Sequence, residues 1–176
     1  MAALVFAATY IHIDIPIPGM GKTMIHLGNT MCILAGLLFG PVSGGLASGI
    51  GSMVYDMFDP VYFPTCWWTF IQKYIMGFVA GVISTRIRGH QRIADTISAI
   101  CGSFCYLILH LSKNFVVYYW IQGMEIETVM AALGTKALTT AVNSAIAVVV
   151  SVILAALLRP ALTKAGIKCC GVSDED

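Results

Sequence analysis

Long apolar runs, separated by short polar or proline-rich breaks, fill the chain from end to end. The pattern predicts helices over residues 2–12, 27–39, 42–58, 67–85, 93–121 and 126–158. A helix needs about 20 apolar residues to cross a bilayer, and the later runs reach or exceed that length. The runs are continuous rather than alternating, which favours helices over a β-barrel. We therefore expect an all-α integral membrane protein, a six-transmembrane-helix bundle that forms a single domain over residues 1–176.

The breaks are marked by proline and glycine. Pro16 and Pro18 forbid a continuous helix in the segment Ile13–His26, so we expect an ordered loop that packs on the bundle. Gly40-Pro41 separates the second helix from the third. The pairs Gly40/Gly44 and Gly45/Gly49 have spacings of four that let helix backbones approach closely.

Composition agrees with a membrane location. The chain is 58% hydrophobic and 11% charged, whereas a soluble domain carries about 25% charged residues. Its net charge of +1 argues against a nucleic-acid partner. The six cysteines show no disulfide framework and are expected to be free thiols, and no cleavable signal peptide is evident.

Most basic residues fall in two clusters at the ends of apolar runs. The first cluster is Arg86, Arg88 and Arg92, and the second is Arg159, Lys164 and Lys168. Basic residues flanking membrane spans favour the cytoplasmic side. With six helices, both termini are then cytoplasmic, and the loop at 13–26 faces outside.

Other polar residues lie inside the apolar runs. Burying them in a membrane costs free energy, so their presence indicates a function. On the expected topology they converge at one depth, in the outer half of the bundle beneath the 13–26 loop. We expect them to line a covered pocket that binds a ligand, and Trp67 and Trp68 are candidates for stacking on a flat one. The candidate binding residues are Asn29, Asp56, Trp67, Trp68, Lys73, His110, Lys113, Asn114, Lys136 and Asn143.

Each candidate also has a structural explanation. Lys73 and Lys113 could extend to the headgroups, and Asp56 could pair with Lys73 only to compensate a buried charge. Asn29 could cap its helix. Lys136 and Asn143 could hold helices together, His110 could be a packing residue, and the tryptophans could form an interfacial belt.

Motifs for catalysis are missing. The chain has no zinc-protease or nucleophile-elbow motif and no acidic pair for magnesium. The run Gly19 to Thr23 echoes a phosphate-binding loop but lacks its spacing. We therefore expect neither an enzyme nor a bound cofactor or metal, and ATP-driven transport would need partner subunits.

Several stretches resemble the substrate-binding S components of energy-coupling factor (ECF) vitamin transporters. The resemblance lies in the run from Ile25 to Ser52, followed by Tyr55-Asp56, and in the run from Trp68 to Gly81. Ala3 and Ala7 match the A-x-x-x-A pattern of the first helix in that family.

The resemblance implies an S component with six helices in a bacterial cell membrane. It also implies a loop that closes over the site and partners comprising a transmembrane coupling subunit and two cytoplasmic ATPases. Ala3 and Ala7 would dock on the coupling subunit. The similarity is nearest to S components for hydroxymethylpyrimidine (a thiamine precursor) or pyridoxine, with riboflavin, pantothenate, folate and cobalamin as alternatives. A stand-alone carrier or channel, in which Asp95 would be an inner ionisable group, and a membrane enzyme are the alternatives of another class.

Overall fold

The fold is a bundle of helices with one short β-hairpin. The computed structural model describes residues 1–17, 21–87, 90–167 and 169–170. Pro18, Gly19, Arg88 and Lys168, which entered the expectations above, lie outside these ranges. The elements in chain order are α1 (Ala2–Tyr10), β1 (His12–Ile17), β2 (Gly21–His26), α2 (Gly28–Phe58), the 3₁₀ turn η1 (Phe63–Thr65), α3 (Cys66–Arg86), α4 (Gln91–Phe115), the π-helical η2 (Val116–Ile121) and α5 (Ile126–Lys164).

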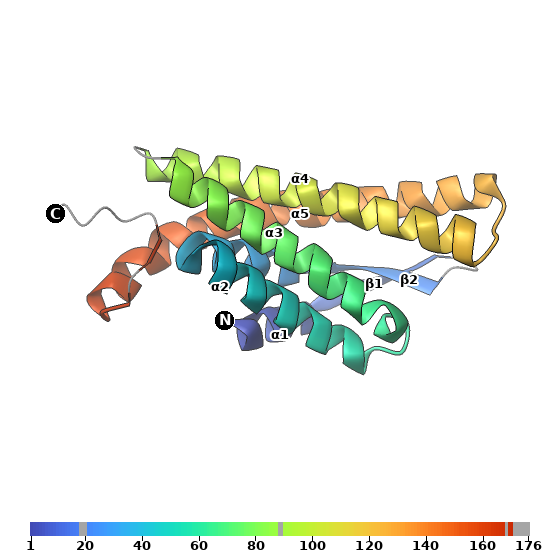
Figure 1. The fold of residues 1–176 in the computed structure, drawn as a ribbon, viewed down its shortest axis with the longest axis horizontal. Coiled ribbons are helices and arrows are strands. Elements are labelled where there is room, and N and C mark those ends of the chain that lie inside the picture. Colours follow the sequence, from blue (N-terminus) through green and yellow to red (C-terminus); the bar gives the residue numbers. More distant parts are fainter. Residues whose placement is uncertain (18–20, 88–89, 168, 171–176) are drawn as a thin grey trace.

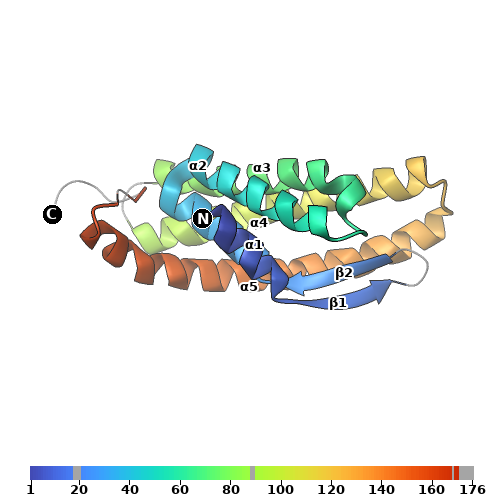
Figure 2. The same cartoon turned by 90° about the horizontal axis from the view of Figure 1, so that it is seen from below.

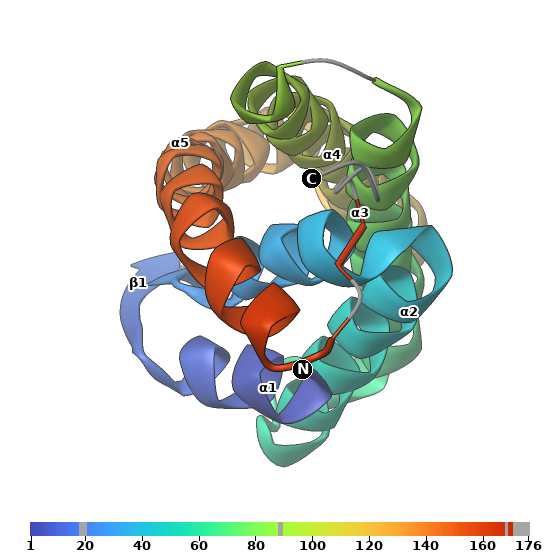
Figure 3. The ribbon, with the colours of Figure 1, turned by 90° about the vertical axis from the view of Figure 1, so that its left-hand side faces the viewer.

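The longest helices run side by side along the molecule. α4 and α5 lie next to each other, and α3 packs between α4 and α2 (Figure 1). Seen from one end, α5, α4, α3 and α2 follow one another around the bundle, and α1 packs on α2 (Figure 3). In the described part of the chain, four helices are long and apolar enough to cross a membrane: α2, α3 with η1, α4 with η2, and α5. The expected count of six spans therefore stays a prediction, because α1 has only nine residues and α2 forms one element.

α2 folds back on itself at the predicted break. Gly40 has φ 78° and ψ −174°, a left-handed conformation that only glycine adopts easily, and Pro41 begins the next helical segment. The Ser48 hydroxyl donates to the carbonyl of Cys32 at 3.0 Å across the fold. A side chain at Gly44 would collide with the backbone of Gly36. The two halves of α2 are thus antiparallel neighbours, and the predicted small-residue spacing is what lets them meet.

The first half of α2 supplies the centre of the hydrophobic core. Ile33, Leu34, Leu37 and Leu38 are at most 1% exposed. A helix that is apolar on every side has to be surrounded by protein or lipid, and here other helices surround it. The second half packs on α3, where side chains at Gly45 and Gly49 would crowd the rings of Tyr74 and Phe70.

The predicted loop at 13–26 contains two strands, His12–Ile17 and Gly21–His26, which pair as an antiparallel hairpin, so the chain is not purely helical. β1 and β2 pair from His12 opposite His26 to Ile17 opposite Gly21. The segment His12–Ile17 alternates polar residues with isoleucine, which is the period of a strand. Pro16 is compatible with this arrangement because β1 is an edge strand. The proline content was interpreted as a loop signal, whereas the alternation was the better guide.

The last helix also differs from its prediction. Arg159-Pro160 was expected to close it, but α5 continues through Pro160 to Lys164. Arg159 is therefore not a free charge at a helix end. It is 6% exposed and donates to both carboxylate oxygens of Asp95, with 2.9 Å between Nη2 and Oδ1.

This buried ion pair joins four helices. Arg159 on α5 also donates to the carbonyl of Leu37 on α2, at 3.1 Å. Asp95 on α4 accepts further hydrogen bonds from Ser84 on α3 and from Gln91, both at 3.1 Å. Asp95 was considered as an inner group of an ion relay. In the structure its carboxylate instead accepts hydrogen bonds from residues of other helices, and these contacts hold the bundle together.

Candidate functional site

A cavity of about 500 Å³ lies at the end of the bundle where the hairpin sits. It is enclosed by the last turns of α2 and α4, the first turns of α3, the part of α5 from Lys136 to Asn143, and the inner strand β2. Figure 2 shows the hairpin extended along the first half of α5. The volume falls within the range of about 300–1,000 Å³ that is typical of small-molecule sites. The helix ends that meet here are those opposite the Asp95–Arg159 pair.

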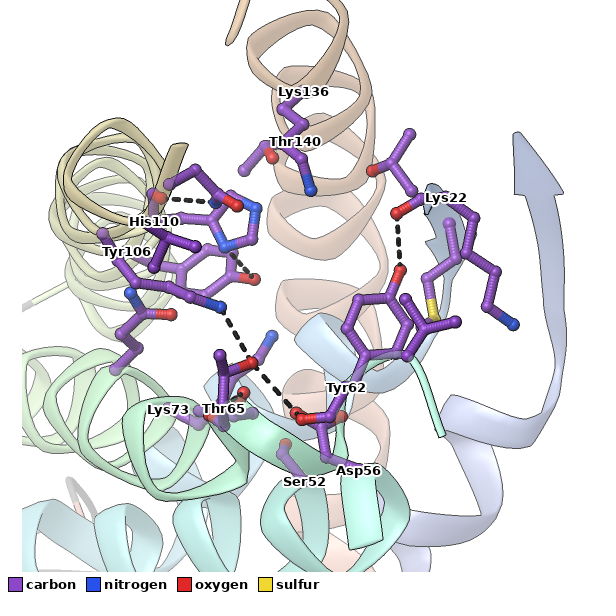
Figure 4. A pocket seen from close by; sticks show the side chains of 18 of the residues that line it. Lys22, Ser52, Asp56, Tyr62, Thr65, Lys73, Tyr106, His110, Lys136 and Thr140 are labelled. Carbon is purple, nitrogen blue, oxygen red and sulfur yellow. Dashed lines mark hydrogen bonds between the residues drawn. The ribbon is translucent and has the colours of Figure 1, made fainter. Parts of the chain in front are cut away.

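Seven of the ten predicted binding residues line this cavity. They come from four different helices and are Asp56, Lys73, His110, Lys113, Asn114, Lys136 and Asn143. Figure 4 shows Asp56 and Lys73 on one side of the space and Lys136 on another. The structure thus brings these polar residues together around one space, and their role in binding a ligand stays a prediction.

Lys73 is held by neutral groups rather than by the expected carboxylate. Its ammonium donates to Asn29 Oδ1 and lies 4.0 Å from the centre of the Tyr106 ring. Lys73 and Asp56 form no direct ion pair in the described part of the chain. Asn29 itself does not line the cavity, and it does not cap α2, whose N-cap is Leu27. Asn29 therefore positions Lys73 from behind.

The polar residues of α4 are arranged around the same space. Lys113 points inward and donates to the Thr65 hydroxyl at 3.1 Å, so it does not extend toward the lipid headgroups. His110 Nδ1 lies 3.4 Å from the Tyr106 hydroxyl. Asn114 donates to the carbonyl of His110 at 2.7 Å, a bond within the helix.

Asn143 on α5 fastens the hairpin to the bundle. Its Oδ1 accepts from the backbone N–H of His26 at 3.1 Å, and its Nδ2 donates to the carbonyl of Met24 at 2.9 Å. One amide thus satisfies two backbone groups on the edge of β2 that does not face β1. His26 Nδ1 accepts from the N–H of Gly28 at 3.0 Å. Burial, with the charge of Lys73 in addition, lowers the pKa of His26 to about 3, so His26 is neutral at physiological pH.

Lys22 ties the hairpin to the segment between α2 and α3. Its ammonium lies 2.9 Å from carboxylate oxygens of both Asp14 and Asp59. The hydrogen bond with Asp59 is the main reason that the pKa of Lys22 is raised to about 12. Burial acts to raise the pKa of Asp59, but the bonds from Lys22 and from the Val61 N–H outweigh it and lower the pKa. Lys22 therefore remains charged, and the contact closes one side of the cavity.

Two predicted residues lie elsewhere. Trp67 and Trp68 are 72% and 50% exposed and do not line the cavity. They lie on the outer surface at the start of α3, and the alternative of an interfacial belt stays a prediction. The ring closest to a buried cation is Tyr106 instead.

Several lining residues were not predicted from the sequence. They are Thr9, Lys22, Thr23, Met24, His26, Ser52, Val61, Tyr62, Pro64, Thr65, Thr69, Gln72, Tyr106, Val117, Tyr118, Ile121, Gln122 and Thr140. Most are hydroxyl-bearing or hairpin residues, which carry little signal in an apolar sequence. The hairpin residues could have been found from the alternation in 12–17, which indicates a strand over the bundle rather than a loop.

The proposed docking pair lies on the surface. Ala3 and Ala7 are both exposed on α1, one turn apart, while Val5 and Ala8 face the interior. A flat surface of small side chains lets another helix approach closely.

The cavity can bind a ligand by hydrogen bonds and charge, but the described residues contain no group of three or more His, Cys, Asp or Glu placed to hold a metal ion. A covered polar cavity at one end of a helical membrane protein has the geometry of a small-molecule binding site. A sequence model of the family described as "ECF-type riboflavin transporter, S component" matches residues 1–164. The chain therefore belongs to this family of S components. No curated protein and no solved structure matches the chain.

Proposed function

We propose that this chain is the vitamin-binding subunit of an ECF-type importer and that the cavity under the hairpin is its binding site. The observation that carries the proposal is the cavity itself, about 500 Å³ in volume and lined by polar residues from four helices and one strand. A family of transport subunits supplies the context. In this role the chain captures its ligand outside the cell, and the hairpin covers it.

The subunit does not drive transport by itself. We propose that it assembles with a transmembrane coupling subunit and two cytoplasmic ATPases, which supply the energy for release. The exposed Ala3 and Ala7 on α1 would form part of the contact with the coupling subunit.

The ligand is proposed to be a small vitamin or precursor with a flat heteroaromatic ring. The sequence resemblance favours hydroxymethylpyrimidine or pyridoxine, whereas the description of the family names riboflavin. Tyr62, Tyr106 and Tyr118 line the cavity and offer surfaces for a ring. The polar walls of the cavity offer hydrogen-bond donors and acceptors for the hydroxyl groups and ring nitrogens of such a ligand.

The test is binding by the purified protein in detergent. Mass spectrometry identifies a co-purified small molecule, and isothermal titration measures the affinity of vitamins for the protein after that molecule has been removed. Lys73→Ala and Asn29→Ala are expected to weaken binding by about tenfold or more, because each removes part of one buried hydrogen-bonded pair. Lys164→Ala is the matched control, since Lys164 is exposed at the far end of α5. Unchanged dissociation constants for both cavity variants would count against this site.

A further inference from the structure

The cavity carries more positive than negative charge. Four lysines line it, of which Lys22 is paired with Asp14 in the hairpin and with Asp59 after α2. The other three, Lys73, Lys113 and Lys136, come from α3, α4 and α5. Among the described lining residues, Asp56 is the one acidic side chain. Three ammonium groups against one carboxylate leave two positive charges without a counter-charge in the walls.

Such an excess is unfavourable in an empty, buried site. Lys73 and Lys136 are 4% and 5% exposed, and removing an ammonium from water costs energy that an opposite charge or hydrogen bonds must offset. In the described part of the chain, none of these three lysines makes a direct ion pair. The walls alone thus leave the charge uncompensated, which is what a site for an anion requires.

The three lysines are not equally available to a ligand. Lys73 is held by Asn29 and the Tyr106 ring, and Lys113 donates to Thr65. Lys136 makes no side-chain hydrogen bond to any described residue.

The nearest aromatic partner of Lys136 is the Tyr118 ring, with 5.6 Å from its nitrogen to the ring centre. That separation is close to the outer limit of about 6 Å for an effective cation–π contact. The Lys136 ammonium is therefore the open donor in the cavity.

A second donor lies one helical turn from Lys136. Thr140 is four residues further along α5, lines the same cavity and is 4% exposed. Residues four apart on a helix share one face, and Figure 4 shows both side chains together on α5. The Thr140 hydroxyl likewise makes no hydrogen bond to a described residue. An ammonium and a hydroxyl side by side are suited to bind the oxygens of a carboxylate or phosphate.

The opposite side of the cavity supplies hydrogen-bond acceptors. Asp56 and Ser52 project into it from the end of α2, and Figure 4 shows them across the space from Lys136 and Thr140. A carboxylate accepts hydrogen bonds from hydroxyl or N–H groups. The cavity therefore has an ammonium and a hydroxyl on α5 and, across the space, a carboxylate with Lys73 on the same side, which gives a bound molecule a defined orientation.

We propose that the ligand of this cavity is an acid: a vitamin or precursor whose carboxylate or phosphate ester binds Lys136 and Thr140, while Lys113 and Lys73 add positive charge elsewhere in the cavity walls. Its hydrogen-bond donors face Asp56. This inference rests on the proposed function and narrows it, because hydroxymethylpyrimidine, pyridoxine and riboflavin in their free forms carry no such group.

The experiment compares matched neutral and anionic compounds by isothermal titration of the full chain in detergent. The pairs are riboflavin with riboflavin 5′-phosphate, pyridoxine with pyridoxine 5′-phosphate, and nicotinamide with nicotinate. For the pair that fits the cavity, the acid is expected to bind about tenfold tighter or more. Phosphate and carboxylate acids are separate arms, so the result also distinguishes the two sources of charge.

Variants connect the preference to the lysines. Lys136→Met is expected to remove the preference for the acid, Lys136→Arg to retain most of it, and the exposed Lys164→Met to leave it unchanged. Far-UV circular dichroism and gel filtration identify a variant that fails to fold, in which case Thr140→Val serves as the second probe and should weaken binding of the acid selectively.

The possible outcomes separate the two proposals. A neutral compound that binds as tightly as its acid, or a co-purified ligand without an acidic group, overturns the anion site and leaves the vitamin-binding function standing. A preference that survives both Lys136→Met and Lys113→Met overturns the assignment to these lysines. If no vitamin binds and none co-purifies, the proposed function fails and the anion site fails with it.

Discussion

The Asp95–Arg159 pair is expected to be the most sensitive electrostatic contact of the bundle. Arg159 is 6% exposed and Asp95 is 2% exposed. The Arg159→Met variant leaves the Asp95 carboxylate with two neutral donors, Ser84 and Gln91, in place of a two-nitrogen contact with a guanidinium. Removing one partner of a buried ion pair costs about 3–5 kcal/mol. Since about 1.4 kcal/mol corresponds to a factor of ten, the unfolded fraction should rise by roughly two to three and a half powers of ten.

The assay is reversible unfolding in mixed micelles, with increasing dodecyl sulfate and helix content followed by circular dichroism. Asp95→Leu should cost about as much as Arg159→Met, because it leaves the guanidinium unpaired. The double variant removes both charges and should be much more stable than the sum of the single effects implies, with a coupling energy of about 2 kcal/mol or more. Arg92→Met is the matched control, since Arg92 is exposed on the same helix as Asp95, and it should change stability by no more than about 0.5 kcal/mol.

Two results would refute this reasoning. If Arg159→Met costs no more than Arg92→Met, the pair does not hold the bundle. If the effects of Arg159→Met and Asp95→Leu simply add, the two residues act through separate contacts.

Three further predictions concern the hairpin and the docking helix. Lys22→Met removes the contact with Asp59 and should speed hydrogen–deuterium exchange in the hairpin. It should lower overall stability by about 1 kcal/mol or less, because the contact is partly exposed. Unchanged exchange would show that the ion pair does not hold the hairpin. The pKa of His26 falls from 6.5 to about 3 on folding, so the unfolded chain binds a proton below about pH 6.5 that the folded chain does not, and acid should destabilise the fold between these values. His26→Gln should flatten that part of a plot of Tm against pH, and an identical plot would contradict the assignment. Ala3→Trp or Ala7→Trp should impair assembly with the coupling subunit while leaving vitamin affinity unchanged, as measured by co-purification and by titration, and assembly that survives both changes would exclude this surface.

The helical regions were largely predictable because each is encoded locally. An apolar run long enough to cross a bilayer must satisfy its backbone internally, so composition alone indicates a helix. The break at Gly40-Pro41 was equally local, since it depends on one residue with φ 78° followed by a proline. The hairpin was missed because Pro16 and the neighbouring glycines suggested a loop, although the alternation in His12–Ile17 carried the strand period.

The candidate site was only partly predictable, because only some of its residues stand out in the local sequence. A lysine or aspartate inside an apolar run stands out by its cost, so Asp56, Lys73 and Lys136 were found from sequence. Threonines and tyrosines do not stand out, and Thr140 and Tyr106 appeared only in the structure. Trp67 and Trp68 were prominent in the sequence, yet their direction on α3 takes them away from the cavity.

The sequence by itself determined that this protein belongs in a membrane, that the chain breaks at Gly40-Pro41, and which charged residues are too costly to be incidental. Those properties depend on the residue type and its immediate neighbours. Only the tertiary structure decided which polar groups face one another: that Arg159 pairs with Asp95 rather than marking a helix end, that Lys73 is held by Asn29 rather than by Asp56, and that Lys136 remains open. These pairings depend on the rotation and depth of helices that are far apart in the chain, which no local pattern encodes.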